Sequence, residues 1–197
     1  SLLILIKALE QHKQSHQKIR LVYTCANETS TDLSYNFVEL RSVMGYMGEM
    51  EPATPLHLVI MLGFEYERAQ QVIESYEPDY ISIGYGNRNH SISSHLHDLN
   101  IKFKEHLVSM YTGNVIDQFE HSLVDPIETK KELERIISLK PDCNTVIAPL
   151  NNKISTIGSG LLAIEHENIQ VCYTQMGAYN TTGYSTPSDQ CYLIELY

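Results

Sequence analysis

The sequence predicts an α/β fold in which helices cover both faces of a mostly parallel sheet. Two apolar runs, Leu56–Leu62 and Thr145–Leu150, are nearly continuous rather than alternating, as is typical of strands that are buried on both faces. Segments with helical apolar spacing separate such runs, and proline, glycine and aspartate residues mark the boundaries between them. This alternation of strands and helices indicates a parallel sheet.

The first 54 residues show the weaker pattern. Apolar residues at helical spacing predict a helix over Ser1–Gln17, and the β-rich run Ile19–Thr24 predicts the first strand of the sheet. The segment Phe37–Met50 is ambiguous, because it begins like a strand but contains Gly45 and Gly48. We therefore expect the clearest part of the fold in residues 55–197.

The segment after Pro55 predicts a complete strand–helix–strand unit. The strand Leu56–Leu62 is followed by a helix that ends near Tyr76, where Glu77–Asp79 interrupts the apolar spacing. A second strand then covers Tyr80–Tyr85. This order within about 30 residues is how two neighbouring parallel strands are connected.

A second unit has the same pattern. Asp125 predicts an N-cap, Pro126 the first helical position and Glu128 a capping box, with a helix that runs to Leu139. The other predicted elements are a helix over Ser93–Tyr111, a short strand or loop over Val115–Phe119, strands over Thr145–Leu150, Ile169–Thr174 and Gln190–Leu196, and a helix over Lys153–His166. Together they predict one Rossmann-like α/β domain over residues 1–197.

Composition excludes several classes of protein. The chain of 197 residues has 14 lysine and arginine residues against 24 aspartate and glutamate residues, a formal net charge of −10 that disfavours generic nucleic-acid binding. No apolar run approaches the roughly 20 residues of a membrane helix. The four cysteines are scattered, without a C-x-x-C pair. We expect a cytoplasmic protein, and the start at Ser1 rather than Met is compatible with a missing upstream segment.

Ligands of open parallel sheets bind beyond the carboxyl ends of the strands, so we expect the binding residues there. The segments directly after the predicted strands are rich in glycine, tyrosine, asparagine and charged residues. The candidate ligand-binding residues are Glu65, Arg68, Gly84, Tyr85, Gly86, Arg88, Asn151, Lys153, Tyr179 and Tyr184.

These residue types point to a phosphorylated ligand, and a nucleotide is the class they fit best. Lys153 opens a helix, where its charge adds to the positive end of the helix dipole. Arg68 can pair with phosphate in a bidentate manner, and Glu65 can accept a hydrogen bond from a ribose hydroxyl. Tyrosines offer flat faces to a base. Each of these residues also has an ordinary structural interpretation. For Arg68, that interpretation is that the side chain only pairs with a neighbouring glutamate.

Two sharper motifs do not hold. The run Gly158-Ser-Gly160-Leu-Leu-Ala163 matches a dinucleotide fingerprint, but it lies inside a predicted helix instead of directly after a strand. His90, His95, His97 and Asp98 resemble a set of metal ligands, but His95 and His97 point in different directions on the predicted helix, so the two cannot share one ion. We therefore predict neither a cofactor nor a metal.

The layout resembles the Rossmann-like ligand-sensing domains of prokaryotic defence proteins, of the CARF type. The resemblance rests on three strands, each taken with the residues directly after it: Leu56–Leu62 with Gly63–Arg68, Tyr80–Tyr85 with Gly86, and Thr145–Leu150 with Asn151–Lys153. It covers the part of the chain after Pro55. It implies a homodimer that binds a cyclic oligonucleotide across the two-fold axis and is coupled to an effector, although the acidic net charge does not favour such a ligand.

These observations leave three functional hypotheses. The first is a binding or sensing domain for a phosphorylated small molecule. The second is a hydrolase or transferase that acts on a similar ligand, with Glu65 as general base or Lys153 as a stabiliser of developing charge. The third is a protein-interaction scaffold that has no ligand.

Overall fold

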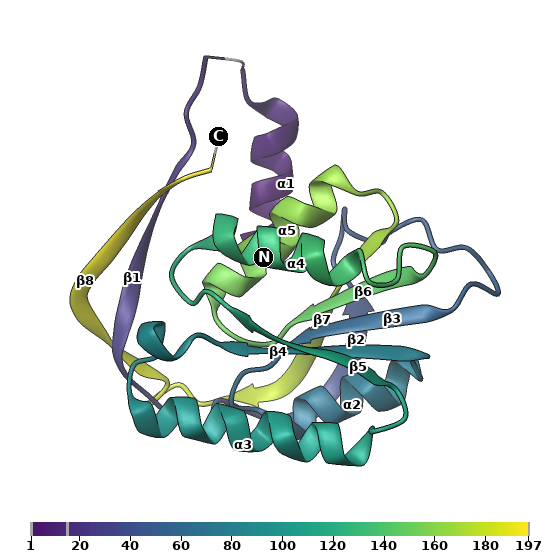
Figure 1. Ribbon diagram of the computed structural model, residues 1–197. Coiled ribbons are helices and arrows are strands. Elements are labelled where there is room, and N and C mark those ends of the chain that lie inside the picture. The colour runs from purple at the N-terminus through teal and green to yellow at the C-terminus, as the bar shows by residue number, and fades with distance from the viewer. Residues whose placement is uncertain (1, 15, 197) are drawn as a thin grey trace.

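The computed structural model describes residues 2–14 and 16–196, which form a six-stranded sheet with helices and a separate two-stranded ribbon (Figure 1). In the main sheet the strands lie in the order β2 (Ser34–Ser42), β7 (Ile169–Tyr179), β6 (Asn144–Pro149), β3 (Leu56–Met61), β4 (Tyr80–Gly86), β5 (Val115–His121). All neighbours pair in parallel except β2, which is antiparallel to β7. The prediction of an α/β fold with a mostly parallel sheet is confirmed.

Helices cover both faces of this sheet (Figure 1). One face packs against α2 (Tyr66–Tyr76) and α3 (Ser94–Met110), and the other against α4 (Pro126–Ile137), α5 (Lys153–Glu165) and α1 (Leu2–His12). A short 3-10 helix, Arg88–His90, comes after β4. Within β3, Leu58 and Ile60 belong to the apolar cluster on the side of α2 and α3. Val59 and Met61 belong to the cluster on the side of α1, α4 and α5. Both faces of this strand therefore have apolar neighbours, which explains its continuous hydrophobic sequence.

The chain changes direction across the sheet between β3 and β6. From β3 it passes to β4 and β5 on one side, then returns to β6 and β7 on the other. The carboxyl ends of β3 and β6 meet closely, because Asn151 Nδ2 donates to the carbonyl of Leu62 at 2.7 Å. Gly63 permits this approach, since a Cβ at this position would lie 2.4 Å from the carbonyl oxygen of Leu150.

The ribbon corrects part of the sequence-based topology. Ile19–Thr24 and Gln190–Leu196 were expected to be strands of the main sheet, but β1 (Arg20–Thr29) and β8 (Ser185–Glu195) pair only with each other, antiparallel. The inward side chains of the ribbon pack on α1 and α5, whereas Val22 and Leu193 are more than 60 % exposed. One face is therefore buried and the other is open to water, which is a pattern of antiparallel strands.

Several element boundaries also differ from the predicted ones. The helix expected over Ser1–Gln17 is observed as α1, which ends at His12, and positions 1 and 15 lie outside the described residues. The ambiguous segment Phe37–Met50 contributes the second half of β2. The segments expected over Val115–Phe119 and Ile169–Thr174 are strands that extend further, to His121 and Tyr179.

At the start of α4, the predicted N-cap Asp125 is confirmed, but the predicted capping box is not formed. Asp125 Oδ1 accepts hydrogen bonds from the backbone N–H groups of Ile127 and Glu128, at 2.8 and 3.2 Å. The reciprocal bond of a capping box is not made, because the N–H of Asp125 donates to Ser122 Oγ at 3.0 Å instead of to the Glu128 side chain. Asp125 is the N-cap, and Ser122 completes the turn.

The two glycines of the rejected fingerprint lie inside α5, as predicted. A Cβ at Gly158 would lie 2.9 Å from Thr129 of α4, and one at Gly160 would lie 2.5 Å from Leu3 of α1. These glycines let α5 approach two other helices.

Replacing Gly63 by alanine is expected to destabilise the fold by at least about 2 kcal/mol, because backbone atoms of Leu150 occupy the space that a Cβ needs. Urea unfolding of Gly63→Ala measures the effect. Gly113→Ala is the matched control, since a Cβ there meets no atom within 4 Å, and it should change stability by less than about 0.5 kcal/mol. Equal stability of the two variants would contradict the close approach of β3 and β6.

A buried histidine makes the stability depend on pH. His57 is fully buried and shares a hydrogen bond of 2.8 Å with Ser82 on the neighbouring strand. Burial lowers the pKa of His57 to about 4, from about 6.5 in the unfolded chain. The unfolded state therefore takes up a proton first as the pH falls, so this contribution to stability is present above about pH 6.5 and is lost toward pH 4.

The double variant His57→Leu/Ser82→Ala is expected to lose less stability than the wild type between pH 7 and pH 5. The difference should be about 2 kcal/mol, the linkage energy of one histidine with the lowered pKa over that interval. Urea unfolding at both pH values measures it. Parallel pH profiles for the two proteins would show that His57 is not the group responsible.

Candidate functional site

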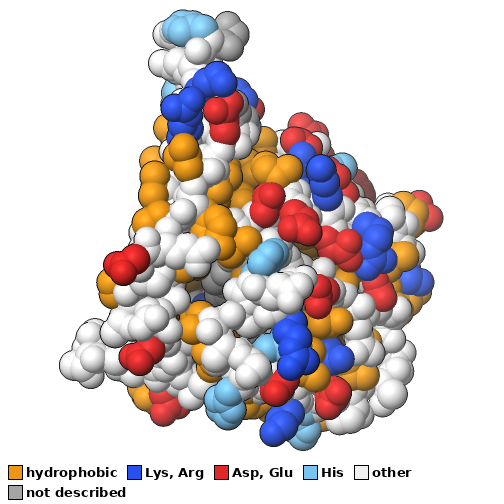
Figure 2. All heavy atoms as spheres, turned by 60° about the vertical axis from the view of Figure 1, so that its left-hand side comes forward, with side chains coloured by type: hydrophobic (Ala, Val, Ile, Leu, Met, Phe, Trp, Pro, Cys, Tyr) orange, Lys and Arg blue, Asp and Glu red, His pale blue; other side chains and the backbone are white. Residues whose placement is uncertain are grey.

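A cleft of about 1690 Å³ lies between the ribbon and the main body (Figure 2). One wall comes from β1 and β8, and another from α1 and the segment after β2. The floor includes the segments directly after β3 and β6, the middle of β7 and its last residue, Tyr179. The cleft therefore includes the region where ligands bind in open parallel sheets, with the ribbon as an additional wall.

The charges that line the cleft are opposite in sign to the charge of the whole chain. Within residues 2–14 and 16–196, three cations line it, Arg41, Arg68 and Lys153, against one carboxylate, Asp189. The chain as a whole carries −10. Arg68 is paired with Glu65 at 2.7 Å and Arg41 with Glu39 at 3.9 Å, whereas Lys153 makes no ion pair with the described residues. Lys153 is therefore the lining cation that is most available to an anion.

The amino-terminal end of α5 opens into the cleft. Asn152 is its N-cap, with Oδ1 accepting from the N–H of Ser155 at 3.0 Å, and the N–H of Thr156 donates to the Asn152 carbonyl at 3.2 Å. The N–H groups of Lys153 and Ile154 come before these bonds, so they have no partner within the helix. Lys153 is exposed at the first helical position, where its charge adds to that of the helix dipole.

Asparagines hold the segments that form the floor of the cleft. Asn152 Nδ2 donates to the carbonyl of Leu123 at 2.8 Å. On the other side, buried Asn100 of α3 donates to the carbonyls of Leu62 and Gly63, at 3.0 and 2.9 Å, and accepts from the N–H of Gly86. Sequence reasoning missed Asn100. The only available signal was a polar residue at a position where helical spacing would place it inward.

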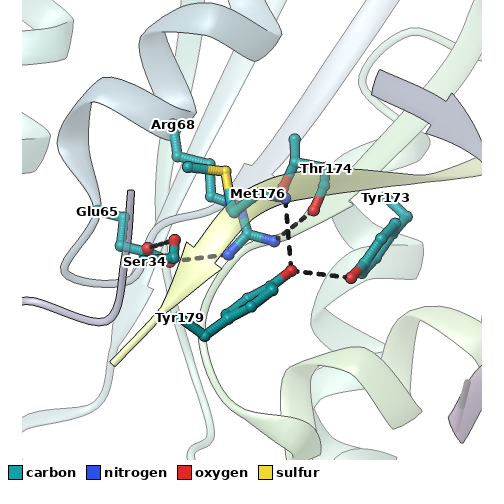
Figure 3. Close-up of polar contacts among 7 residues, drawn as sticks. All are labelled: Ser34, Glu65, Arg68, Tyr173, Thr174, Met176 and Tyr179. Atoms are coloured by element: carbon teal, nitrogen blue, oxygen red, sulfur yellow. Dashed lines mark hydrogen bonds and ion pairs between the residues drawn. The ribbon is translucent and has the colours of Figure 1, made fainter. Parts of the chain in front are cut away.

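Glu65 and Arg68 form an ion pair that joins α2 to the edge of the sheet (Figure 3). Arg68 Nη1 lies 2.7 Å from Glu65 Oε2, and Arg68 Nη2 donates to the carbonyl of Thr174 at 3.2 Å. Arg68 Nε also donates to Thr174 Oγ1, and Ser34 Oγ donates to Glu65. The ion pair of Arg68 with a neighbouring glutamate, which the structural interpretation requires, is therefore present.

This pairing restricts what both side chains can do for a ligand. Both carboxylate oxygens of Glu65 already accept hydrogen bonds, its side chain is only 11 % exposed, and it does not line the cleft. Arg68 does line the cleft. Its guanidinium has five N–H donors and three are used here, so two remain for an anion.

Tyrosines form the aromatic part of the lining. Tyr179 and Tyr184 are both about half exposed in the cleft. The hydroxyl of Tyr179 lies 3.1 Å from that of Tyr173, whose ring lies 5.6 Å from the Arg41 guanidinium (Figure 3 shows the tyrosine pair). Burial and the nearby Glu65 carboxylate raise the pKa of Tyr184, so this phenol is protonated at neutral pH. Flat, uncharged ring faces are thus available beside the cations.

The structure brings together only part of the predicted site. Arg68, Asn151, Lys153, Tyr179 and Tyr184 line the cleft. The remaining candidates do not line it: Glu65, Gly84, Tyr85, Gly86 and Arg88.

The candidates after β4 have structural surroundings instead. A Cβ at Gly84 would lie 2.5 Å from the Phe119 ring, and one at Gly86 would lie 2.8 Å from Leu123, so both glycines serve close packing. The ring of Tyr85 lies 5.1 Å from the Lys104 ammonium of α3. Arg88 is exposed on the 3-10 helix, although the next residues, from Asn89 to Ile92, do line the cleft.

No family model matches the chain, and no curated protein matches its sequence. In the part of the chain that the structure describes, no three histidine, cysteine, aspartate or glutamate side chains lie close enough together to hold a metal ion. No helix there is both long and apolar enough to cross a membrane.

Arg68→Leu is expected to destabilise the protein by about 2 kcal/mol, because Glu65 would keep its charge in a largely buried position without a partner. The double variant Arg68→Leu/Glu65→Leu should recover part of this loss. Urea unfolding measures both. In the control Arg135→Leu, the lost partners are the more exposed Glu132 and Asp117, and the change should stay below about 1 kcal/mol. Equal losses in Arg68→Leu and Arg135→Leu would contradict the structural role of the Glu65–Arg68 pair.

Proposed function

We propose that this protein is a Rossmann-like domain that binds or senses a phosphorylated small molecule, with nucleotides as the first class to test. The observation that carries the proposal is the cationic lining of the cleft in an acidic chain. Arg41, Arg68 and Lys153 line it from three separate elements, β2, α2 and α5.

The position of the cleft supports a phosphate at the start of α5. The backbone N–H groups of Lys153 and Ile154 and the Lys153 ammonium provide donors and positive charge at one place. Asn151 lies beside them, at the point where the strand order changes direction between β3 and β6. In open α/β sheets this is the crevice that ligands occupy, and the order β5-β4-β3-β6-β7 supports the Rossmann-like part of the proposal.

Tyr179 and Tyr184 support a ligand that also has a flat ring. Both side chains are half exposed, and Tyr184 lies close enough to Glu65 and Arg68 for their charges to affect its pKa. A base stacked on either ring would place its phosphate toward the cations of the same cleft.

The hydrolase or transferase hypothesis has less support. Its named base, Glu65, is engaged through both oxygens and does not line the cleft. Lys153 remains available to stabilise developing charge, so turnover of a bound ligand is the measurement that separates an enzyme from a sensor. The homodimer and the coupled effector stay predictions.

A thermal-shift panel tests the proposed function. It covers mono-, di- and cyclic nucleotides, sugar phosphates and NAD. At a hundredfold excess over Kd, binding to the native state adds about 2.7 kcal/mol, which is several degrees for a domain of this size. Lys153→Ala should abolish the shift without lowering the melting temperature of the free protein, because the side chain is exposed and makes no ion pair with the described residues.

The matched control is Lys102→Ala, which removes an exposed lysine of α3 outside the cleft. It should leave the shift unchanged. A shift that survives in Lys153→Ala would exclude the start of α5 as the phosphate site. A panel without any shift would leave the interaction scaffold as the better hypothesis.

A further inference from the structure

The cleft is larger than a mononucleotide requires. Its volume is about 1690 Å³, whereas pockets for small molecules usually measure roughly 300–1,000 Å³. A phosphate and one ring would occupy only the part near α5 and the tyrosines. A substantial part of the cleft would then be left to another portion of the ligand.

That other part of the cleft is apolar. It is lined by Leu2 and Ile4 of α1 and by Val43, Met44 and Met47 after β2. Ile4, Met44 and Met47 are 40 %, 74 % and 66 % exposed, so large apolar side chains face water inside a concave surface. Such exposure is unfavourable unless an apolar group covers it, and methionine side chains adapt to groups of varied shape.

The α1 part of the apolar wall packs on α5 beyond Lys153. Leu3 packs where a Cβ of Gly160 would be, seven residues after Lys153 in α5. At 1.5 Å per residue this corresponds to about 10 Å along the helix. The hydroxyl of buried Tyr46 donates to the carbonyl of Leu3 at 3.0 Å, so the segment that carries Met44 and Met47 is fastened to α1.

We propose that the ligand of this cleft is a phosphate ester that carries a hydrocarbon chain. The phosphate lies at the start of α5 beside Lys153, and the chain extends along Ile4, Met44 and Met47. This inference rests on the proposed function, which supplies the phosphate site. It narrows the ligand class, because a simple nucleotide or sugar phosphate has no group that covers the apolar wall.

Calorimetric titration with alkyl phosphates tests the inference, using ethyl, hexyl and decyl phosphate below their micelle-forming concentrations. Burial of each methylene is worth a factor of about three to four in affinity. Decyl phosphate should therefore bind at least about tenfold more tightly than ethyl phosphate, even if only a few methylenes are covered. Lys153→Ala should weaken the binding of every member of the series.

Two variants separate the chain from the phosphate. Met44→Gln/Met47→Gln keeps the charge of the cleft but makes its apolar wall polar, so it should reduce decyl phosphate affinity at least about threefold and leave ethyl phosphate unchanged. Leu193→Gln is the control, because Leu193 is 68 % exposed, like the two methionines, but lies outside the cleft. It should change neither affinity.

The outcomes distinguish the two proposals. If AMP or ethyl phosphate binds in a Lys153-dependent manner and the hydrocarbon chain adds no affinity, the chain inference is wrong and the proposed function stands. If decyl phosphate binds equally well to the wild type and to Lys153→Ala, the cleft holds apolar groups without a phosphate, which overturns both. If none of the phosphates binds, both proposals are likewise overturned.

Discussion

The close contact between the carboxyl ends of β3 and β6 is the constraint on which the cleft depends. Only a residue without a side chain fits at Gly63, and the amide of Asn151 then bridges to Leu62. This contact sets where α5 begins, so it also sets where the unpaired N–H groups of that helix point. The buried Asn100 secures the same region from the opposite face.

Electrostatics and apolar exposure act together in this cleft. Its cations lie in a protein whose net charge is strongly negative, so the surrounding acidic surface repels polyanions in general while the cleft retains local attraction. The Glu65–Arg68 pair holds one of those cations in place and leaves part of its donor set unused. We therefore propose a compact anion, rather than a nucleic acid, as the ligand of the cleft.

The sequence predicted the main sheet well and the ribbon poorly, for a physical reason. Strands such as Leu56–Met61 are buried on both faces and have a continuous apolar sequence, which identifies them locally. β1 and β8 form a separate ribbon because they pair with each other across more than 150 intervening residues. Local periodicity in the sequence does not report such long-range pairing. Lys153 and Asn151, which line the cleft, were predicted because ligands bind beyond the carboxyl ends of parallel strands. Met44 and Met47 were not, because only the ribbon and α1 make them part of a cleft.

The ribbon also affects the order in which the molecule assembles. Thr24 and Cys191 face each other in it although they lie 167 positions apart, whereas β3, β4 and their helix form contacts over short separations. Closing so long a loop is entropically costly until the intervening sheet has brought the ends together. During synthesis the body can therefore fold before β8 emerges from the ribosome, and the outer wall of the cleft is completed only after β8 has paired with β1.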